Sequence, residues 1–431
     1  MNNFSKNTLT ENQDSRIADI LEQAMAAAKG NNWLLVTQCL QELPLERHRK
    51  PSQPPRERST ARKGSHGVML DEGDRDIILK LALEVLAEGD FQERWEVAKI
   101  FPAMGEIAIA PLTDIISDEN ADLECRWFTC RILGEFPQSV VVMSLIQLIE
   151  RNEDEDLTEM AAQSLANLGS AAIVPLSNLL AKEESRLLAV QGLAHIRHPD
   201  AIAPLLSIVK DPSPIIRAIA IEALNRFHAP QITTVLLESL KDTATAVRKE
   251  AIIGLGLRVG ELPENCNLVN HLQPLLFDIN IEVCRQAAVA LGRVGTDAAA
   301  HALSLILKSP LTPTGLKIET VRSLSWIGTP QALEYLGAGL EGESKSTCLE
   351  IISVLGRTEF PSLKPKATQI IIDFLHSGQG ICQETPVKQA IALSLGQLRE
   401  SSGIDSLREL AQDSEEGIKL HAIAALKKFS Y

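Results

Sequence analysis

The sequence of 431 residues is poor in aromatic side chains, which make up 4% of it, although 45% of its residues are hydrophobic. A core built from so few rings must be aliphatic, made mainly of leucine, isoleucine, valine and alanine. Such a composition favours packed helices. The same kind of composition continues along the whole chain, so we expect one kind of architecture rather than a string of unrelated modules.

Long hydrophobic runs are also lacking. The longest nearly apolar run, residues 139–149, is shorter than the roughly 20 residues that a membrane-spanning helix needs, and Gln147 interrupts it. The polar residues 1–7 do not resemble the basic and then apolar start of a secretory signal. We therefore expect that no segment spans a membrane. We also expect a cytoplasmic location, in the cytosol.

Sequence signatures of catalysis and metal binding are missing as well. There is no G-x-x-x-x-G-K-[ST] or H-E-x-x-H motif, and no two cysteines form a C-x-x-C pair. We therefore predict no catalytic residue, no cofactor and no metal ligand. A net charge of −14 argues against nucleic acid as a partner of the whole chain. We expect reduced thiols, mostly in the core, at Cys39, Cys125, Cys130, Cys266, Cys284, Cys348 and Cys382.

What the sequence does contain is an internal repeat with a period of about 28 to 40 residues, the range typical of solenoid proteins. The segment 247–251 aligns with 216–220, and both are followed by a leucine seven residues after the arginine. Extending this register gives eleven anchor positions, eight of them basic: Arg94, Arg126, Thr158, Arg186, Arg217, Arg248, Cys284, Lys317, Cys348, Lys388 and Lys419.

Two further rows follow each anchor at helical spacing. Seven residues later stand Phe101, Leu133, Leu165, Leu193, Leu224, Leu255, Leu291, Leu324, Leu355, Leu395 and Leu426. Three residues after the anchor stand Val97, Thr129, Ala161, Ala189, Ala220, Ala251, Ala287, Thr320, Ile351, Ile391 and Ala422. Both rows share one helix face, and the small or branched row would let neighbouring helices approach closely.

A second apolar segment precedes each of these helices, as in residues 108–112, 172–176 and 201–205, each with proline in its first turn. Each unit is therefore a helical hairpin that cannot bury its apolar face alone, so that neighbouring hairpins must stack. The prediction is an all-α fold, an α-solenoid of about eleven two-helix repeats.

Over residues 75–431 these segments resemble HEAT repeats, and in particular the short HEAT-like repeats named after the phycobilisome lyases of cyanobacteria, which include bilin lyases of the E/F type. The resemblance is carried by residues 200–206 followed by Ile216-Arg217 and Ala223-Leu224, and by Glu282-Val283 followed by residues 290–292. It extends to cyanobacterial HEAT-repeat proteins that interact with IscA-type iron–sulfur assembly proteins.

The N-terminal part stands outside the repeats. Residues 1–46 contain two short apolar-periodic segments around Gly30, which predict a separate helical hairpin. Residues 47–70 contain several prolines and are strongly basic, which is typical of a disordered linker. Residues 71–431 would form the solenoid.

The sharpest candidate for a binding site lies in the first two repeats, one and five residues after the anchor. There the sequence places Trp95 with Lys99 and Trp127 with Arg131, two pairs of a ring and a cation on the face that should look outward. Such pairs suit a protein hot spot or a propionate-bearing tetrapyrrole. The alternative is that the tryptophans pack under the linker or cap the end of the array.

The remaining polar features have structural explanations. The basic anchors should hydrogen-bond the turn of the neighbouring repeat, and the acidic run 150–159 should cap a helix. Two insertions, around 260–270 with Cys266 and around 376–386 with Cys382, suggest solvent-exposed spacers, with a contact to a partner as the alternative.

The array itself favours a non-catalytic protein-binding scaffold or adaptor. The resemblance implies a setting in phycobilisome or iron–sulfur protein maturation, with a phycobiliprotein or an iron–sulfur assembly protein as partner. The alternative that it implies is a bilin lyase or bilin-handling chaperone, with bilin as the ligand.

Overall fold

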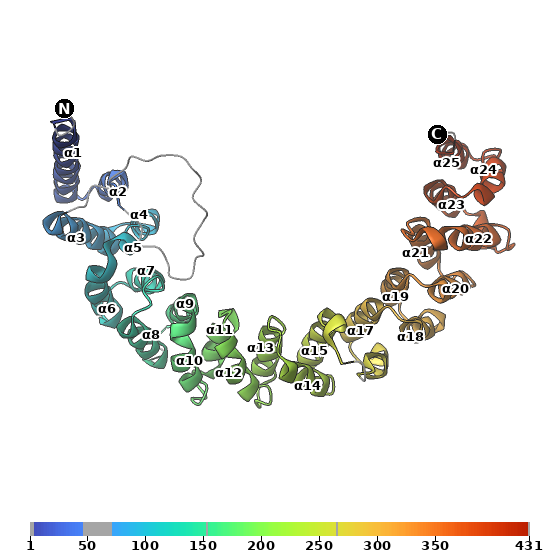
Figure 1. The fold of residues 1–431 in the computed structure, drawn as a ribbon, viewed down its shortest axis with the longest axis horizontal. Helices are drawn as coiled ribbons and strands as arrows, with labels where there is room; N and C mark the ends of the chain where they lie inside the picture. Colours follow the sequence, from blue (N-terminus) through green and yellow to red (C-terminus); the bar gives the residue numbers. More distant parts are fainter. Residues whose placement is uncertain (1–3, 46–70, 152–153, 264–265, 430–431) are drawn as a thin grey trace. The chain divides into compact units, whose positions relative to one another are not determined.

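The computed structural model describes residues 4–45, 71–151, 154–263 and 266–429, and all regular elements in these ranges are α-helices or short 3₁₀ helices (Figure 1). The predicted linker, residues 47–70, lies outside them. The chain divides into two compact units, Met1–Lys210 and Asp211–Tyr431. The all-α prediction is confirmed, and each unit is a stack of helical hairpins.

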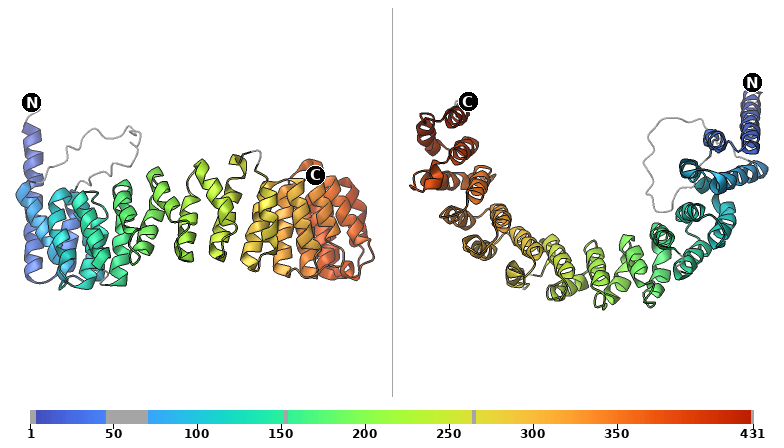
Figure 2. Two further views of the ribbon diagram at one scale, coloured as in Figure 1. Left: turned by 90° about the horizontal axis from the view of Figure 1, so that it is seen from below. Right: turned by 180° about the vertical axis from the view of Figure 1, so that it is seen from behind.

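In the first unit the hairpins form two rows of helices (Figures 1 and 2). Helices α4, α7, α9 and α11 pack side by side in one row, and α6, α8 and α10 pack in the other. The elements are α1 (Phe4–Lys29), α2 (Trp33–Glu42), α3 (Glu72–Glu88), α4 (Phe91–Val97), α5 (Phe101–Met104), η1 (Gly105–Ala108), α6 (Ile109–Ser117), α7 (Leu123–Leu133), α8 (Ser139–Arg151), α9 (Glu155–Asn167), η2 (Gly169–Ala172), α10 (Ile173–Leu179), α11 (Arg186–His195), η3 (Pro199–Ala201) and α12 (Ile202–Ser207).

The N-terminal hairpin does not stand apart from the repeats. Helix α2 packs against both α3 and α4, and α1 also contacts α3. A hydrogen bond of 2.8 Å from Gln41 Nε2 to Glu96 Oε2 joins α2 to α4. The apolar stripe of α1, which includes Ile17, Leu21 and Ala24, is buried. Because a two-helix hairpin cannot enclose this stripe by itself, the first repeat covers it.

The second unit has the same two-row arrangement. Helices α13, α15, α17, α19, α21, α23 and α25 each pack against the next one in their row, and α18, α20 and α22 pack in the other row (Figure 2). The elements are α13 (Pro214–Leu224), α14 (Pro230–Ser239), α15 (Thr245–Leu257), η4 (Val259–Glu261), α16 (Leu268–Leu272), η5 (Gln273–Phe277), α17 (Ile281–Val294), α18 (Asp297–Lys308), α19 (Thr314–Ile327), α20 (Pro330–Ala338), α21 (Lys345–Gly356), η6 (Pro361–Leu363), α22 (Lys364–Leu375), η7 (Gly380–Gln383), α23 (Thr385–Leu398), η8 (Ser401–Gly403), α24 (Ile404–Leu410) and α25 (Glu416–Lys427).

The predicted register is confirmed. Every anchor lies in the second helix of a hairpin, from α4 to α25. The whole row three residues after the anchors is buried, and so is the row of leucines and Phe101 seven residues after them, except for Leu426 in the last helix. Leu426 is half-buried, since α25 is covered only by α23 and α24 among the described helices.

Glycine often follows the leucine of this row, at the place where neighbouring helices come closest. A Cβ at Gly356 would lie 2.5 Å from the side chain of Ser394, and one at Gly396 would lie 2.6 Å from the Cβ of Ala425. Neither distance leaves room for a methyl group. These glycines therefore set the close approach of α21, α23 and α25.

The basic anchors form a ladder of hydrogen bonds. Arg217 makes two bonds of 2.8 and 2.7 Å to the carboxylate of Asp242, and Arg248 makes two bonds of 2.8 Å to Asp278. Arg248 Nη1 also donates to the carbonyl of Asp242, which precedes its own helix. The expected bond to the neighbouring repeat is confirmed for Arg94, Arg217, Arg248, Lys317 and Lys388.

The pKa values of two acids in this ladder, Asp242 and Asp278, are lowered. At Asp278 burial alone would raise the pKa, but the hydrogen bond from Arg248, the backbone N–H of Asn280 and the charge of Arg248 together lower it. The same balance lowers the pKa of Asp242 beside Arg217. Folding therefore favours the ionised form of both carboxyl groups.

One stretch among the described residues, Phe91–Ser117, has the length and mean hydropathy (1.4) of a membrane-spanning helix. This differs from the expectation that no segment is apolar enough. The stretch is divided into α4, α5, η1 and α6, and Gly105 breaks its helical path with φ of 67°. Of its most apolar window, 44% is buried within the protein.

Most residues of the second insertion, 376–386, are exposed, as expected of a spacer, but Cys382 is an exception. Residues 380–383 form η7, and the side chain of Cys382 is fully buried. Its Sγ donates a hydrogen bond of 2.9 Å to the carbonyl of Phe374 at the end of α22. The insertion therefore packs back onto its own repeat. In the first insertion, Cys266 is half-buried.

Replacing Leu255 with alanine should lower the free energy of unfolding by about 2–5 kcal/mol, because it opens a cavity between buried rows. Urea melts followed by circular dichroism measure the loss. Leu257→Ala is the matched control, since Leu257 lies in the same helix with its side chain 59% exposed. An equal effect of both changes would contradict the register.

Replacing Asp278 with asparagine should cost roughly 1.5–3 kcal/mol of stability at pH 7, because it removes a charge-assisted pair from Arg248. The lowered pKa of Asp278 contributes stability that is complete above about pH 5 and is lost as the pH falls through its folded-state value. Wild type and variant should therefore converge in stability only at a pH below the lowered, folded-state pKa of Asp278. Asp405→Asn, at an exposed ion pair with Arg408, should change little at any pH.

Candidate functional site

The candidate site is built on the N-terminal ends of α4 and α7, which carry apolar residues at corresponding positions. Asp90 caps α4 with a reciprocal pair of hydrogen bonds: Glu93 N donates to Asp90 Oδ1 (2.9 Å), and Asp90 N donates to Glu93 Oε2 (2.8 Å). In α7 the cap is Asp122, which accepts from Cys125 N at 3.0 Å. Each cap is followed at once by an exposed apolar residue, Phe91 in α4 and Leu123 in α7.

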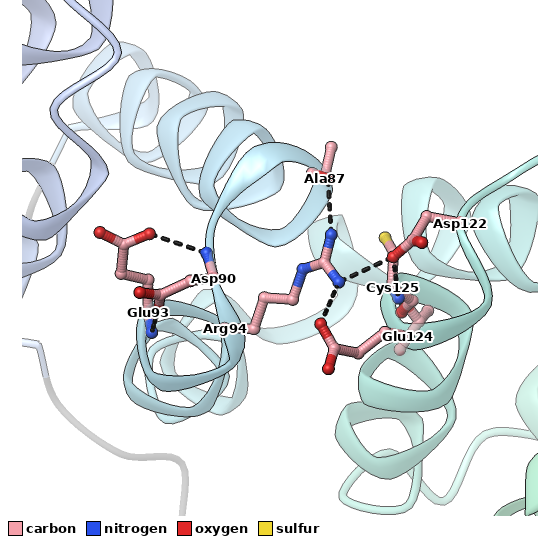
Figure 3. Close-up of polar contacts among 8 residues, drawn as sticks. Ala87, Asp90, Glu93, Arg94, Asp122, Glu124 and Cys125 are labelled. Atoms are coloured by element: carbon pink, nitrogen blue, oxygen red, sulfur yellow. Dashed lines mark hydrogen bonds and ion pairs between the residues drawn. The ribbon is translucent and has the colours of Figure 1, made fainter.

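Arg94 fixes these two helices against each other (Figure 3). Its Nη1 donates to Asp122 Oδ2 at 2.7 Å and to Glu124 Oε2 at 2.5 Å, and its Nη2 donates to the carbonyl of Ala87 at 2.9 Å. The guanidinium is buried. Because Asp122 is also the cap of α7, a single arginine sets where the second helix starts relative to the first.

An aromatic cluster bridges α4 and α7. The rings of Phe91 and Trp95 stack with centroids 6.2 Å apart, and both meet Phe128 edge to face. Trp127 also meets Phe128 edge to face at 5.2 Å. Phe128 is fully buried, whereas Trp95 and Trp127 are half-buried. The tryptophans are therefore part of the packing between repeats and are partly open to solvent.

The predicted pairing of each tryptophan with the cation in its own helix is wrong for Arg131. The Cζ of Arg131 lies 3.5 Å from the ring centroid of Trp95 in the preceding repeat, and not on Trp127. Burial lowers the pKa of Arg131, and the charge of Glu135 opposes that effect. The cation is thus used within the protein to join α7 to α4.

Lys99 has a partner of its own as well. Its Nζ lies 2.6 Å from Glu96 Oε1, and this hydrogen bond is the main reason that the pKa of Glu96 is lowered. Lys99 is exposed. Neither candidate cation therefore stands beside Trp127 to receive a carboxylate or phosphate.

A groove of about 450 Å³ opens beside Trp127, between the starts of α4, α7 and α9. Its apolar surface consists of Phe91, Leu123, Trp127, Leu157 and Met160, of which Phe91 is 53% and Leu123 is 47% exposed. The other lining residues are Glu124, Asp154, Asp156, Glu159 and Gln163. Among the residues that the structure describes, no lysine or arginine lines it.

The acidic run was expected to cap a helix, and for Asp154 that is confirmed. Asp154 Oδ1 accepts from Leu157 N at 2.9 Å at the start of α9, where the positive end of the helix dipole favours carboxylates. Asp156 and Glu159 are exposed on the same helix. The run thus also supplies the acidic side of the groove.

Sequence reasoning found Trp127 but missed Phe91 and Leu123, and it assigned the acids of α9 to a helix cap and not to a binding surface. A signal was present, because Phe91 precedes Trp95 by four residues and Leu123 precedes Trp127 by four, which places each pair on one helix face. In the third repeat Glu155 and Glu159 occupy the corresponding positions. At both positions the residue therefore changes from apolar in the first two repeats to acidic in the third.

A second groove, of about 800 Å³, lies in the second unit between α19, α20, α21 and η6. Trp326 and Phe360 line it with 55% and 48% of their surfaces exposed. Gly328 is required here, because it has φ of 63° and a Cβ would lie 2.2 Å from the ring of Phe360. Arg322 in the lining is paired with Glu350 at 2.9 Å. Sequence reasoning did not single out this surface.

In the part of the chain that the structure describes, no group of three or more histidine, cysteine or acidic residues is arranged to bind a metal ion. Burial raises the pKa of Cys130 to about 12, and burial together with Glu343 and Cys382 raises that of Cys348 to about 11. Cys284 donates to the carbonyl of Asp278 in the place of a basic anchor.

Comparison with known proteins shows which repeat family part of this architecture resembles. Residues 173–256 match the family described as HEAT repeats. A comparison with curated proteins finds no match. The chain is therefore an all-α solenoid with HEAT-like stacking, and the family match itself covers residues 173–256. The finer resemblance to the phycobilisome-lyase repeats gains no support from these comparisons and stays a prediction.

Among solved structures, importin β aligns with 95% of this chain and 65% of its own length, at 11% identity and a TM-score of 0.54. Kap121p bound to Ste12p aligns with 84% of this chain and 42% of its own length, at 14% identity and a TM-score of 0.50. The chain thus spans less than two thirds of either protein. An engineered protein aligns with 83% of this chain and 96% of its own, at 18% identity and a TM-score of 0.36. At these identities the likeness concerns the fold alone.

Proposed function

We propose that the chain is a non-catalytic scaffold that binds a protein partner through the groove beside Trp127. The observation that carries the proposal is the exposed apolar surface of Phe91, Leu123 and Trp127 on helices held in register by Arg94. Large aromatic side chains in a preformed depression are typical of the residues that contribute most to protein binding. Within the unit, stacked repeats also present such a surface without reorganisation.

The proposed setting is the maturation of phycobilisomes or of iron–sulfur proteins, with a phycobiliprotein or an IscA-type iron–sulfur assembly protein as partner. Its support is the resemblance of the repeats to those of cyanobacterial proteins. The proposal retains the cytosolic location expected from the sequence.

Trp127→Ala should weaken partner binding at least tenfold, because a truncated aromatic anchor commonly costs about 2 kcal/mol or more. Purified phycobiliprotein and a purified IscA-type protein are titrated separately against the tagged chain, with binding followed by biolayer interferometry. Phe91→Ala, which removes another side chain that lines the groove, should have a similar effect.

Trp326→Ala is the matched control, since it removes a tryptophan side chain from the second unit, where the ring is 55% exposed, and should leave binding unchanged. Circular dichroism and melting temperatures verify that the variants fold. Wild-type affinity for both partners in Trp127→Ala and Phe91→Ala would show that this groove is not the binding site.

The alternative function is that of a bilin lyase or bilin-handling chaperone, in which the candidate ring and cation pairs would hold a tetrapyrrole. The charges in the groove oppose this alternative, because Asp154, Asp156 and Glu159 would repel the propionate groups of a bilin. Arg131 and Lys99, the cations that would attract them, are engaged with Trp95 and Glu96.

Mixing the full chain with phycocyanobilin should therefore leave the absorbance spectrum of the bilin unchanged. The measurement is a titration in the visible range, with an apo-phycobiliprotein added in a second series to detect bilin transfer. A saturable spectral shift that Trp127→Ala removes would favour the bilin function over the scaffold.

A further inference from the structure

The groove beside Trp127 combines an apolar floor with charge of one sign. Its lining contains five apolar residues, one glutamine and the four acids Glu124, Asp154, Asp156 and Glu159. The charge of Glu124 is compensated by the buried Arg94 at 2.5 Å. The other three acids form no ion pair within the described parts of the chain, so they leave the groove with an uncompensated negative charge.

The helix cap explains only part of this charge. Asp154 is the cap of α9, and Asp156 lies in its first turn, where a carboxylate stabilises the helix. Glu159 lies in the second turn, where the helix dipole contributes little. Among the described residues, the only hydrogen bond to the carboxylate of Glu159 comes from Gln163 Nε2, at 3.2 Å. The carboxylate of Glu159 is exposed beside the apolar residues of the groove, and it neither caps a helix nor forms an ion pair with a described residue. Such a carboxylate indicates a surface that attracts cations.

We propose that the groove binds a basic amphipathic peptide segment of the partner, with an apolar side chain against Phe91, Leu123 and Trp127 and a lysine or arginine beside Asp156 and Glu159. A volume of about 450 Å³ accommodates a few side chains of a segment rather than a folded domain. Burying the apolar side chain supplies affinity, and the charges select the partner and speed its association. The inference rests on the proposed function and specifies the chemistry of the partner.

The test uses the full chain and three fluorescein-labelled peptides of equal length in fluorescence anisotropy titrations. The first peptide alternates leucine with pairs of lysines, the second has glutamate for every lysine, and the third has serine for every leucine. Only the first should bind with a saturable isotherm. Its dissociation constant should rise at least tenfold between 50 and 500 mM salt, because salt screens the charges.

The double variant Asp156→Asn/Glu159→Gln should weaken binding of the first peptide about tenfold or more. Both residues are exposed, so the fold should be unaffected. The matched control is Glu415→Gln/Glu416→Gln, which removes two charges from the exposed start of α25 in the second unit and should not change binding. An equal loss in both variants, or equal binding of the glutamate peptide, would overturn the inference.

The chain itself contains a competing occupant. Residues 47–67 carry seven bases, Arg47, Arg49, Lys50, Arg56, Arg58, Arg62 and Lys63, and the single acid Glu57. A full-length variant with all seven bases changed to glutamine should bind the first peptide as the wild type does. Binding that becomes tenfold tighter would overturn the inference in favour of this segment of the same chain.

The two proposals fail in different ways. If Trp127→Ala abolishes partner binding but the lysine peptide does not bind, the scaffold function stands and the basic chemistry is wrong. If Trp127→Ala leaves partner binding unchanged, the groove is not the partner site and both proposals fail.

Discussion

The structure depends on one constraint: a single helical hairpin of this sequence cannot bury its own apolar face. The leucine row and the small-residue row lie on the same face of each second helix, and their side chains are excluded from solvent only where another repeat covers them. Leu426, in α25, is only half-buried, and α25 is covered by described helices on one side of its row only. Stability therefore comes from contacts between neighbouring repeats, and a repeat is stable only as part of its unit.

Hydrophobic contact is not directional, so it does not by itself fix how far one repeat slides along the next. The anchor side chains supply that register. Arg248 holds the turn before its own helix and, through Asp278, the turn before the next one, and Arg94 links α4 to α7 in the same way. Because the pairs are largely buried and bonded at both ends, they specify a position as well as contributing energy.

Because the register between repeats is fixed, exposed residues of successive helices lie next to each other and form a continuous surface. The residues that line the groove come from α4, α7 and α9 and are far apart in the sequence, but the stack brings them together. Phe91 and Leu123 share one offset from their anchors, and Trp127 and Glu159 share another. The binding chemistry therefore changes along the array with the residues that each repeat carries at these two offsets. A scaffold of this kind acquires a binding site by substitution at exposed offsets, without change to its core.

The sequence by itself determined the helical hairpins, their order and the buried rows, because helical periodicity is local and the repeat shows it many times over. It also identified Trp95 and Trp127 as residues outside the leucine row. Only the tertiary structure decided that Arg131 stacks on Trp95 of the preceding repeat, that Cys382 turns inward, and that the groove is acidic. These outcomes depend on distances between repeats, which are set by side-chain packing across helices and leave no periodic signal along the chain.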